Sequence, residues 1–240
     1  MSSRDKILAT VKANQPEQRA LPELRLGAGG ADGAVAAGVG AGGGDLSAAA
    51  GTDLSAAFIT MLEAIGGSAY MVSGYERIAT ILREQHPRVG RIISGCPELE
   101  VFAETGKRYA DPHVLEDVGL AVLKAHFGVA ENGACWITED RMIERALPFI
   151  AQHLALVIRC QDIVADMHGA YEWIEKIEGA AAQAEGAGAE KGVGSYGFAT
   201  FIAGPSKTAD IEQSLVLGAH GPRSLLVFLI DEGLSDAGFY

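Results

Sequence analysis

Hydrophobic positions along this chain fall into two patterns, short continuous runs and runs at helical spacing. Continuous runs predict buried strands, at residues 68–73, 89–94, 118–125, 134–138, 153–159, 201–203 and 225–230. Apolar residues three or four positions apart predict amphipathic helices, at 4–14, 54–65, 75–85 and 167–178, with a further helix at 141–147. Strands and helices that alternate in this way are typical of an α/β fold.

The segment from 68 to 94 indicates how the strands run. Two strands joined by one helix in about thirty residues form a βαβ unit, whose strands are parallel. We therefore expect a mainly parallel sheet flanked by helices.

Two tracts rich in glycine and alanine interrupt the pattern. In residues 27–51, 19 of 25 positions are glycine or alanine, which predicts a flexible linker because there is little side-chain surface to bury. The expected organisation is an N-terminal helix plus linker over 1–53 and a single α/β domain over 54–240. A second tract, 179–194, has 11 such residues in 16 and is expected to be a mobile loop, either an active-site lid or simply disordered.

Composition restricts the classes of function. The net charge of −12 argues against a protein that binds the nucleic-acid backbone, which needs clustered Lys and Arg. Cys96, Cys135 and Cys160 form no Cys-x-x-Cys pair, so we expect no iron–sulfur or zinc cofactor in this chain. We find no apolar run of the ~20 residues that span a membrane and no apolar signal core, so we expect a cytoplasmic protein with no membrane span.

The C-terminal third holds the densest group of polar residues that could form a site. After the turn at Gly204-Pro205, a helix is expected to begin at Ser206, Lys207 and Thr208. Its backbone N–H groups and hydroxyls suit an anion. The alternative is a helix cap alone, with Asp210 in the first turn.

Two further turns contribute candidates. His220 and Arg223 lie beside Gly221-Pro222 at the entry to a strand, where they could bind a substrate carboxylate or simply order the loop. Glu131, Asn132 and Gly133 form a turn between two apolar strands. A glutamate there could be partly desolvated and reactive, face a ligand, or belong to an ordinary turn.

These motifs resemble a known family. The run from Gly204 to Glu212, the run from Gly218 to Arg223 and the segment from Gly128 to Gly133 resemble the lactate utilization protein C family, also called LUD-domain proteins. The resemblance implies a fold similar to ribose-5-phosphate isomerases and coenzyme A transferases. It also implies a part in the oxidation of L-lactate to pyruvate, as a non-redox component beside partner proteins that carry iron–sulfur clusters.

We therefore expect the three turns to meet at one edge of the sheet and to bind a small anionic metabolite or a partner surface. Glu131 is the candidate catalytic residue, because Glu-Asn-Gly also resembles the catalytic element of coenzyme A transferases. The candidate ligand-binding residues are Asn132, Gly133, Gly204, Ser206, Lys207, Thr208, Asp210, His220 and Arg223. An accessory subunit of a lactate-oxidising complex is favoured. The alternatives are a stand-alone acyl or coenzyme A transferase, a sugar-phosphate isomerase, and a pure interaction protein.

Overall fold

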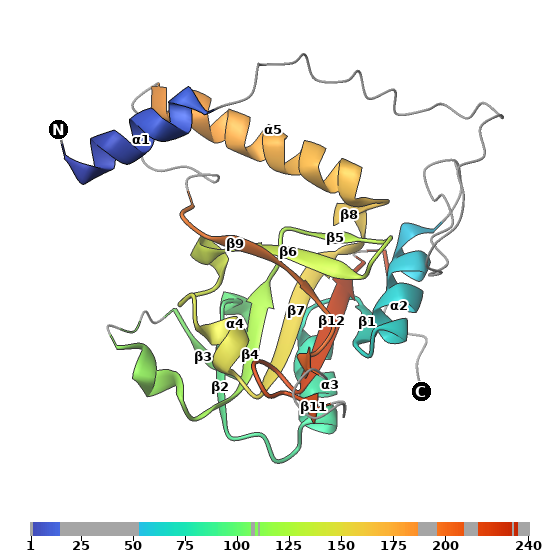
Figure 1. Cartoon of the computed structure of the whole chain (residues 1–240). Coiled ribbons are helices and arrows are strands. Elements are labelled where there is room, and N and C mark those ends of the chain that lie inside the picture. The colour runs from blue at the N-terminus through green and yellow to red at the C-terminus, as the bar shows by residue number, and fades with distance from the viewer. Residues whose placement is uncertain are drawn as a thin grey trace. The chain divides into compact units, whose positions relative to one another are not determined.

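A computed structural model gives the structure of the chain, and Figure 1 shows its elements. It describes residues 2–14, 53–106, 109, 111–186, 196–208, 216–231 and 233–234, with the side chains of 178–186 excepted. The chain divides into two units, 1–41 and 42–240. The predicted linker at 27–51 lies outside the described residues.

In the first unit, helix α1 (Ser3–Ala13) confirms the predicted N-terminal helix. Ser2 accepts a hydrogen bond from the Asp5 N–H while Asp5 accepts one from the Ser2 N–H, so a capping box starts the helix. None of its residues is buried.

The second unit is built on a six-stranded sheet in which every pair of neighbours is parallel. The strand order is β1-β12-β7-β4-β2-β3. The bounds are β1 Ser68–Val72, β2 Arg91–Ser94, β3 Glu104–Thr105, β4 Val118–Lys124, β7 His153–Arg159 and β12 Ser224–Ile230. The predicted α/β fold with a mainly parallel sheet is confirmed.

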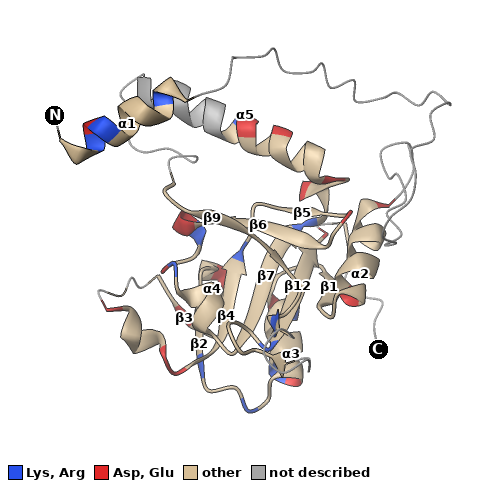
Figure 2. Cartoon of the chain, in the orientation of Figure 1, with Lys and Arg blue, Asp and Glu red and all other residues tan. Residues whose placement is uncertain are grey.

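Both faces of this sheet are covered, because its central strands are apolar on both sides. One face packs against α3 (Tyr75–Gln85), which contributes Ile78 and Leu82. The other face packs against α2 (Leu54–Ala64) through Phe58 and Leu62, together with a second, smaller sheet. The middles of the central strands carry no Lys, Arg, Asp or Glu (Figure 2). Polar chemistry is therefore confined to the strand ends.

The second sheet has the order β8-β5-β6-β9 and forms a separate layer above the first (Figure 1). Helix α5 (Met167–Gly186) covers its outer face, where Ala170 and Ile174 pack on Phe127 and Val129. At Gly128 an added Cβ would lie 2.8 Å from Ile158 of β7 and 2.9 Å from Phe58 of α2, so glycine allows β5 to lie this close to both. The strand bounds are β5 Phe127–Val129, β6 Ala134–Thr138, β8 Ile163–Val164 and β9 Ala199–Ala203.

The remaining elements are short. Within the described ranges, a two-stranded ladder pairs β10 with β11, and four 3₁₀ turns and one short helix connect the strands. Their bounds are β10 Lys207–Thr208, β11 Val216–Leu217, η2 Pro97–Leu99, η3 Pro112–Leu115, η4 Glu139–Arg141, α4 Leu147–Ile150 and η5 Cys160–Asp162.

Three local predictions were wrong. The helix expected at 141–147 is replaced by η4, bends and α4, with Ile143 at a φ of 66° that ends helical geometry. No helix begins at Ser206 to Thr208, since Lys207 and Thr208 pair as an extended strand with β11. Residues 179–186 continue α5, so the first half of the second tract is helical because alanine favours helix.

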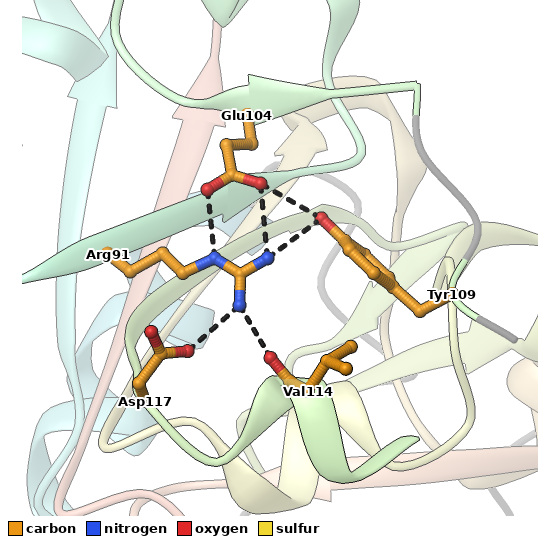
Figure 3. Close-up of polar contacts among 5 residues, drawn as sticks. All are labelled: Arg91, Glu104, Tyr109, Val114 and Asp117. Atoms are coloured by element: carbon orange, nitrogen blue, oxygen red, sulfur yellow. Dashed lines mark hydrogen bonds and ion pairs between the residues drawn. The ribbon is translucent and has the colours of Figure 1, made fainter. Parts of the chain in front are cut away.

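One arginine, Arg91, links the amino ends of β2 and β4 through hydrogen bonds (Figure 3). Arg91 Nε and Nη2 donate to Glu104 at 2.8 and 3.2 Å, and Nη1 donates to Asp117 at 2.8 Å. Nη1 also donates to the Val114 carbonyl at 2.6 Å, and Nη2 to the Tyr109 hydroxyl at 3.3 Å. These five contacts use all five N–H donors of the guanidinium. Arg91 therefore holds β2, β3 and the start of β4 together and has no donor left for a ligand.

Candidate functional site

Three adjoining cavities lie at the carboxyl ends of the parallel strands. The largest, about 410 Å³, lies beside Gly95, Lys124 and Arg141. The second, about 250 Å³, shares Lys124 and Arg141 with it. The third, about 330 Å³, shares Arg159 with the second. We call these the carboxyl-end cavities. Open α/β sheets bind ligands at this end of their strands, so this is the candidate site.

The second cavity is rich in positive charge. Lys124, Arg141 and Arg159 line the second cavity, against a single carboxylate, Asp162. Arg159 holds that carboxylate through two hydrogen bonds of 2.7 and 3.0 Å. Such a cavity favours an anionic ligand.

Lys124, the last residue of β4, is already partnered. Its Nζ donates to Glu98 at 2.8 Å and lies 5.0 Å from the centre of the Tyr75 ring. Burial acts to lower the pKa of Lys124, but the hydrogen bonds to Glu98 and Tyr75 outweigh it and the pKa is raised. Lys124 therefore stays charged, with part of its charge neutralised.

Arg141 differs because no carboxylate of the described residues forms an ion pair with it. Its Nη1 donates to the Ala125 carbonyl at 2.8 Å, which fixes the guanidinium in place. Burial lowers the pKa of Arg141, partly opposed by the more distant Asp140 and Asp162. A half-buried guanidinium with unused donors is suited to bind a carboxylate or phosphate oxygen.

A hydrogen-bonded chain lies beside these cations. His126 Nε2 is 2.6 Å from the Thr138 hydroxyl, and Thr138 donates to Asp140. His126 is 6% exposed and lines the second cavity. Burial, together with the positive charge of Arg141, lowers the pKa of His126 to about 4. The imidazole is therefore neutral near pH 7.

The backbone at the largest cavity is strained. Ile143 lines it with a φ of 66°, a left-handed conformation that a β-branched side chain disfavours. Ile143 is the sole non-glycine residue with positive φ among those the structure describes. Strain of this kind gathers at functional sites, which agrees with the placement of the site here.

The predicted catalytic turn lies away from these cavities. Glu131 accepts a hydrogen bond from the Met167 N–H at 3.0 Å, so its exposed carboxylate caps the start of α5. Asn132 accepts from the Ala134 N–H at 3.0 Å and shapes the turn. At Gly133, with a φ of 67°, an added Cβ would lie 2.9 Å from the backbone of Leu62, so packing against α2 requires glycine.

The second predicted group also has structural contacts. Gly204, at a φ of 71°, packs against the Ile65 carbonyl. The Ser206 N–H donates to Pro222 at 2.9 Å, and the Ser206 carbonyl accepts from Gly218. Lys207 Nζ donates to the carbonyl of Ile65, the C-cap of α2. Thr208 pairs with Val216 in the short ladder. Asp210 lies outside the described residues.

The third predicted group, His220 and Arg223, lies before the first residue of β12. Both side chains are exposed, and the Arg223 N–H donates to the Gln152 carbonyl at 2.8 Å. By contrast, the Glu131 N–H donates to the Ala165 carbonyl at 3.0 Å, and Ala165 lies in the segment that follows the carboxyl end of β7. In Figure 1 the β5–β6 layer and β11 lie at opposite ends of the main sheet. The expectation that the turns at 131 and 220 meet at one edge is therefore wrong, while their roles in ligand binding stay predictions.

Sequence reasoning did not single out Lys124, Arg141 or Arg159. A signal was present, because two of the longest apolar runs end in a single basic residue, at Lys124 and Arg159. Parallel strands bring such terminal residues to one edge. Arg141 carries no such signal, because it lies in a 3₁₀ turn without periodicity.

Comparison with known proteins agrees with this architecture. The LUD domain model matches residues 96–230, more than half of the chain. The chain belongs to the LUD domain family. The match includes both sheets apart from β1 and β2, and all but four of the residues that line the carboxyl-end cavities.

Two curated relatives carry the name Lactate utilization protein C. The LUD chain is 30% identical over 117 residues to the one from Bacillus pumilus, which covers 49% of this chain and 44% of the relative. It is 28% identical over 126 residues to the one from Shouchella clausii, which covers 52% and 49%. The matched segment thus spans less than half the length of either relative.

A solved structure shares the fold. The crystal structure of a DUF162 family protein from Deinococcus radiodurans matches with a TM-score of 0.50 at 17% identity, over 74% of this chain and 96% of that protein. Among the helices that the structure describes, none has both the length and the apolar character needed to cross a membrane.

Proposed function

We propose that this protein takes part in lactate utilization as a non-redox component that binds a small carboxylate, L-lactate or a close relative, in the carboxyl-end cavities. The names of the two relatives support the pathway. The observation that carries the proposal is the guanidinium of Arg141, which is half-buried, fixed by Ala125 and without an ion pair to a described carboxylate.

A small carboxylate fits this environment. Its two oxygens can accept paired hydrogen bonds from one guanidinium. Lys124 adds positive charge from the adjoining strand end, and the second cavity, about 250 Å³, has room for an acid of this size. The carboxylate would therefore rest at the boundary that the first two cavities share.

Oxidation of the acid would require an electron acceptor. The cysteines of this chain do not fit an iron–sulfur cluster, since Cys96 and Cys135 are fully buried on opposite faces of the main sheet. Iron–sulfur partner proteins are therefore part of the proposal. Co-purification of the tagged full chain with cluster-bearing proteins, read from their absorbance and iron content, tests it.

The binding proposal is tested by calorimetry with L-lactate and pyruvate. Arg141→Gln should weaken binding at least tenfold, because a hydrogen bond to a charged group contributes roughly 1.5–3 kcal/mol. Arg145→Gln is the matched control, because Arg145 is four residues away, pairs with Glu139 and lines none of the three cavities. Equal affinity in Arg141→Gln and the parent, or no binding of either acid by the parent, would overturn the proposal.

The alternative of a transferase that uses Glu131 has less support. Its carboxylate is engaged with the α5 backbone and lines none of the three cavities. Trapping with acyl-coenzyme A and borohydride remains the direct test, and covalent reduction at Glu131 would establish that enzyme.

A further inference from the structure

The hydrogen-bonded chain from Asp140 through Thr138 to His126 sets the state of the imidazole. Thr138 gives its single hydrogen to Asp140, so its oxygen must accept from His126. His126 Nε2 therefore carries the ring hydrogen, and Nδ1 carries the free lone pair. This tautomer follows from the directions of the two hydrogen bonds.

The acceptor nitrogen has no partner of its own in the protein. Among the described residues, His126 Nδ1 forms no hydrogen bond. The ring lines the second cavity, with the Trp173 ring 5.9 Å away between centroids. A neutral acceptor on a cavity wall is open to a donor from a ligand or from water.

The position of this acceptor relative to the cation is fixed by the chain itself. Arg141 Nη1 is bonded to the carbonyl of Ala125, the residue directly before His126. Arg141 and His126 also line the same cavity, so a carboxylate held by Arg141 can point its next carbon toward the imidazole. Three charged groups act on the pKa of the ring: Arg141 lowers it, while Asp140 and Asp162 raise it. Burial lowers the pKa more than any of these charges shifts it, so the ring stays neutral.

From this juxtaposition we propose that His126 is a specificity-determining residue that accepts a hydrogen bond from the hydroxyl of a 2-hydroxy acid. The assignment rests on the proposed function, since Arg141 must hold the carboxylate. A 2-oxo acid offers only a carbonyl, so two acceptors would face each other. An acid without a substituent at that carbon would leave Nδ1 without a donor. The site therefore selects L-lactate over pyruvate and over propionate.

The test compares affinities of the full chain for L-lactate, pyruvate and propionate. L-Lactate should bind roughly tenfold more tightly than either of the others, as one hydrogen bond in a buried site provides. Thr138→Val removes the group that fixes the tautomer while keeping the side-chain shape, so the preference should shrink severalfold. His126→Phe keeps a ring and removes the acceptor nitrogen, so it should abolish the preference and still leave all three carboxylates bound through Arg141.

A second measurement does not depend on a variant. Nitrogen-15 NMR of the histidines in the parent should show an Nε2–H tautomer at His126. Its Nδ1 resonance should move when L-lactate is added and stay in place with propionate. Equal affinity for the three acids, or an Nδ1 resonance unaffected by L-lactate, would overturn the inference and leave carboxylate binding in place. Failure of all three acids to bind would instead remove the proposed function.

Discussion

Each end of the main sheet has a partly buried arginine, but the two arginines differ in how many of their N–H donors the protein uses. At the amino end, Arg91 gives all its donors to Glu104, Asp117, Tyr109 and Val114. At the carboxyl end, Arg141 gives one donor to a backbone carbonyl and faces a cavity. The first arrangement holds strands together, while the second leaves hydrogen-bonding capacity for a ligand. The number of N–H donors already used within the protein thus separates the structural Arg91 from Arg141, the candidate for ligand binding.

The most direct way to break this comparison is to remove the saturated arginine. Arg91→Met should lower the free energy of unfolding by about 2–3 kcal/mol, because Glu104 would lose two hydrogen bonds to a cation at a partly buried position. Arg91→Lys should recover part of the loss, since one ammonium cannot replace the planar fork. Urea unfolding measures both values. Binding of L-lactate per folded molecule should be unchanged, and a parallel loss of binding would contradict the division between the two ends.

Lowering the pH should reduce the stability of the fold through buried histidines near both ends of the main sheet. Burial lowers the pKa of His86, His126 and His153 from the ordinary value of 6.5, in His126 to about 4. Below pH 6.5 the unfolded chain binds protons that the folded chain does not, so stability falls as pH falls toward the folded values. Each histidine contributes a slope of up to about 1.4 kcal/mol per pH unit. Urea unfolding from pH 7.5 to 5 measures the slope, which His126→Asn should reduce; an unchanged slope would count against neutral burial of the ring.

Replacing the arginine at the carboxyl end tests the same comparison from the other side. Arg141→Met should change the free energy of unfolding by less than about 1 kcal/mol, because only the hydrogen bond to Ala125 is lost. L-Lactate binding should fall at least tenfold in the same protein. A loss of stability as large as that of Arg91→Met would show that Arg141 is structural as well.

The smallest expected effect concerns a lysine that was predicted to bind ligand. Lys207→Met should cost about 0.5 kcal/mol, because the ammonium at the C-terminus of α2 is lost. Thermal unfolding detects the change, and Lys207→Arg should restore it. If L-lactate affinity also drops, Lys207 has the ligand role that the sequence suggested.

The pattern of apolar residues predicted the framework well. The runs at 118–125 and 153–159 became β4 and β7, since strands buried on both faces need continuous apolar residues. The helix expected after Pro205 was wrong, because pairing with Val216 and Leu217 overrode local preference. Such pairing depends on residues distant in the chain and is not visible in a local window.

The location of the site could be predicted only in part. Hydroxyls, glycines and a histidine around 204–223 suggested chemistry, yet these residues shape turns and cap helices at the amino end. The partnership of His126 and Thr138 depends on the antiparallel register of β5 and β6. That register places residues twelve positions apart side by side, which spacing alone did not reveal.

The connection between the two sheets has a mechanical consequence. Only Ala125 and His126 separate the end of β4 from the start of β5, and the His126 N–H is tied to Trp136 of β6 at 2.8 Å. The imidazole therefore belongs to the upper layer while the guanidinium is anchored at the joint below it. Any tilt of that layer would therefore alter the spacing between the imidazole and the guanidinium, so the geometry of the second cavity depends on how the smaller sheet packs on the larger one.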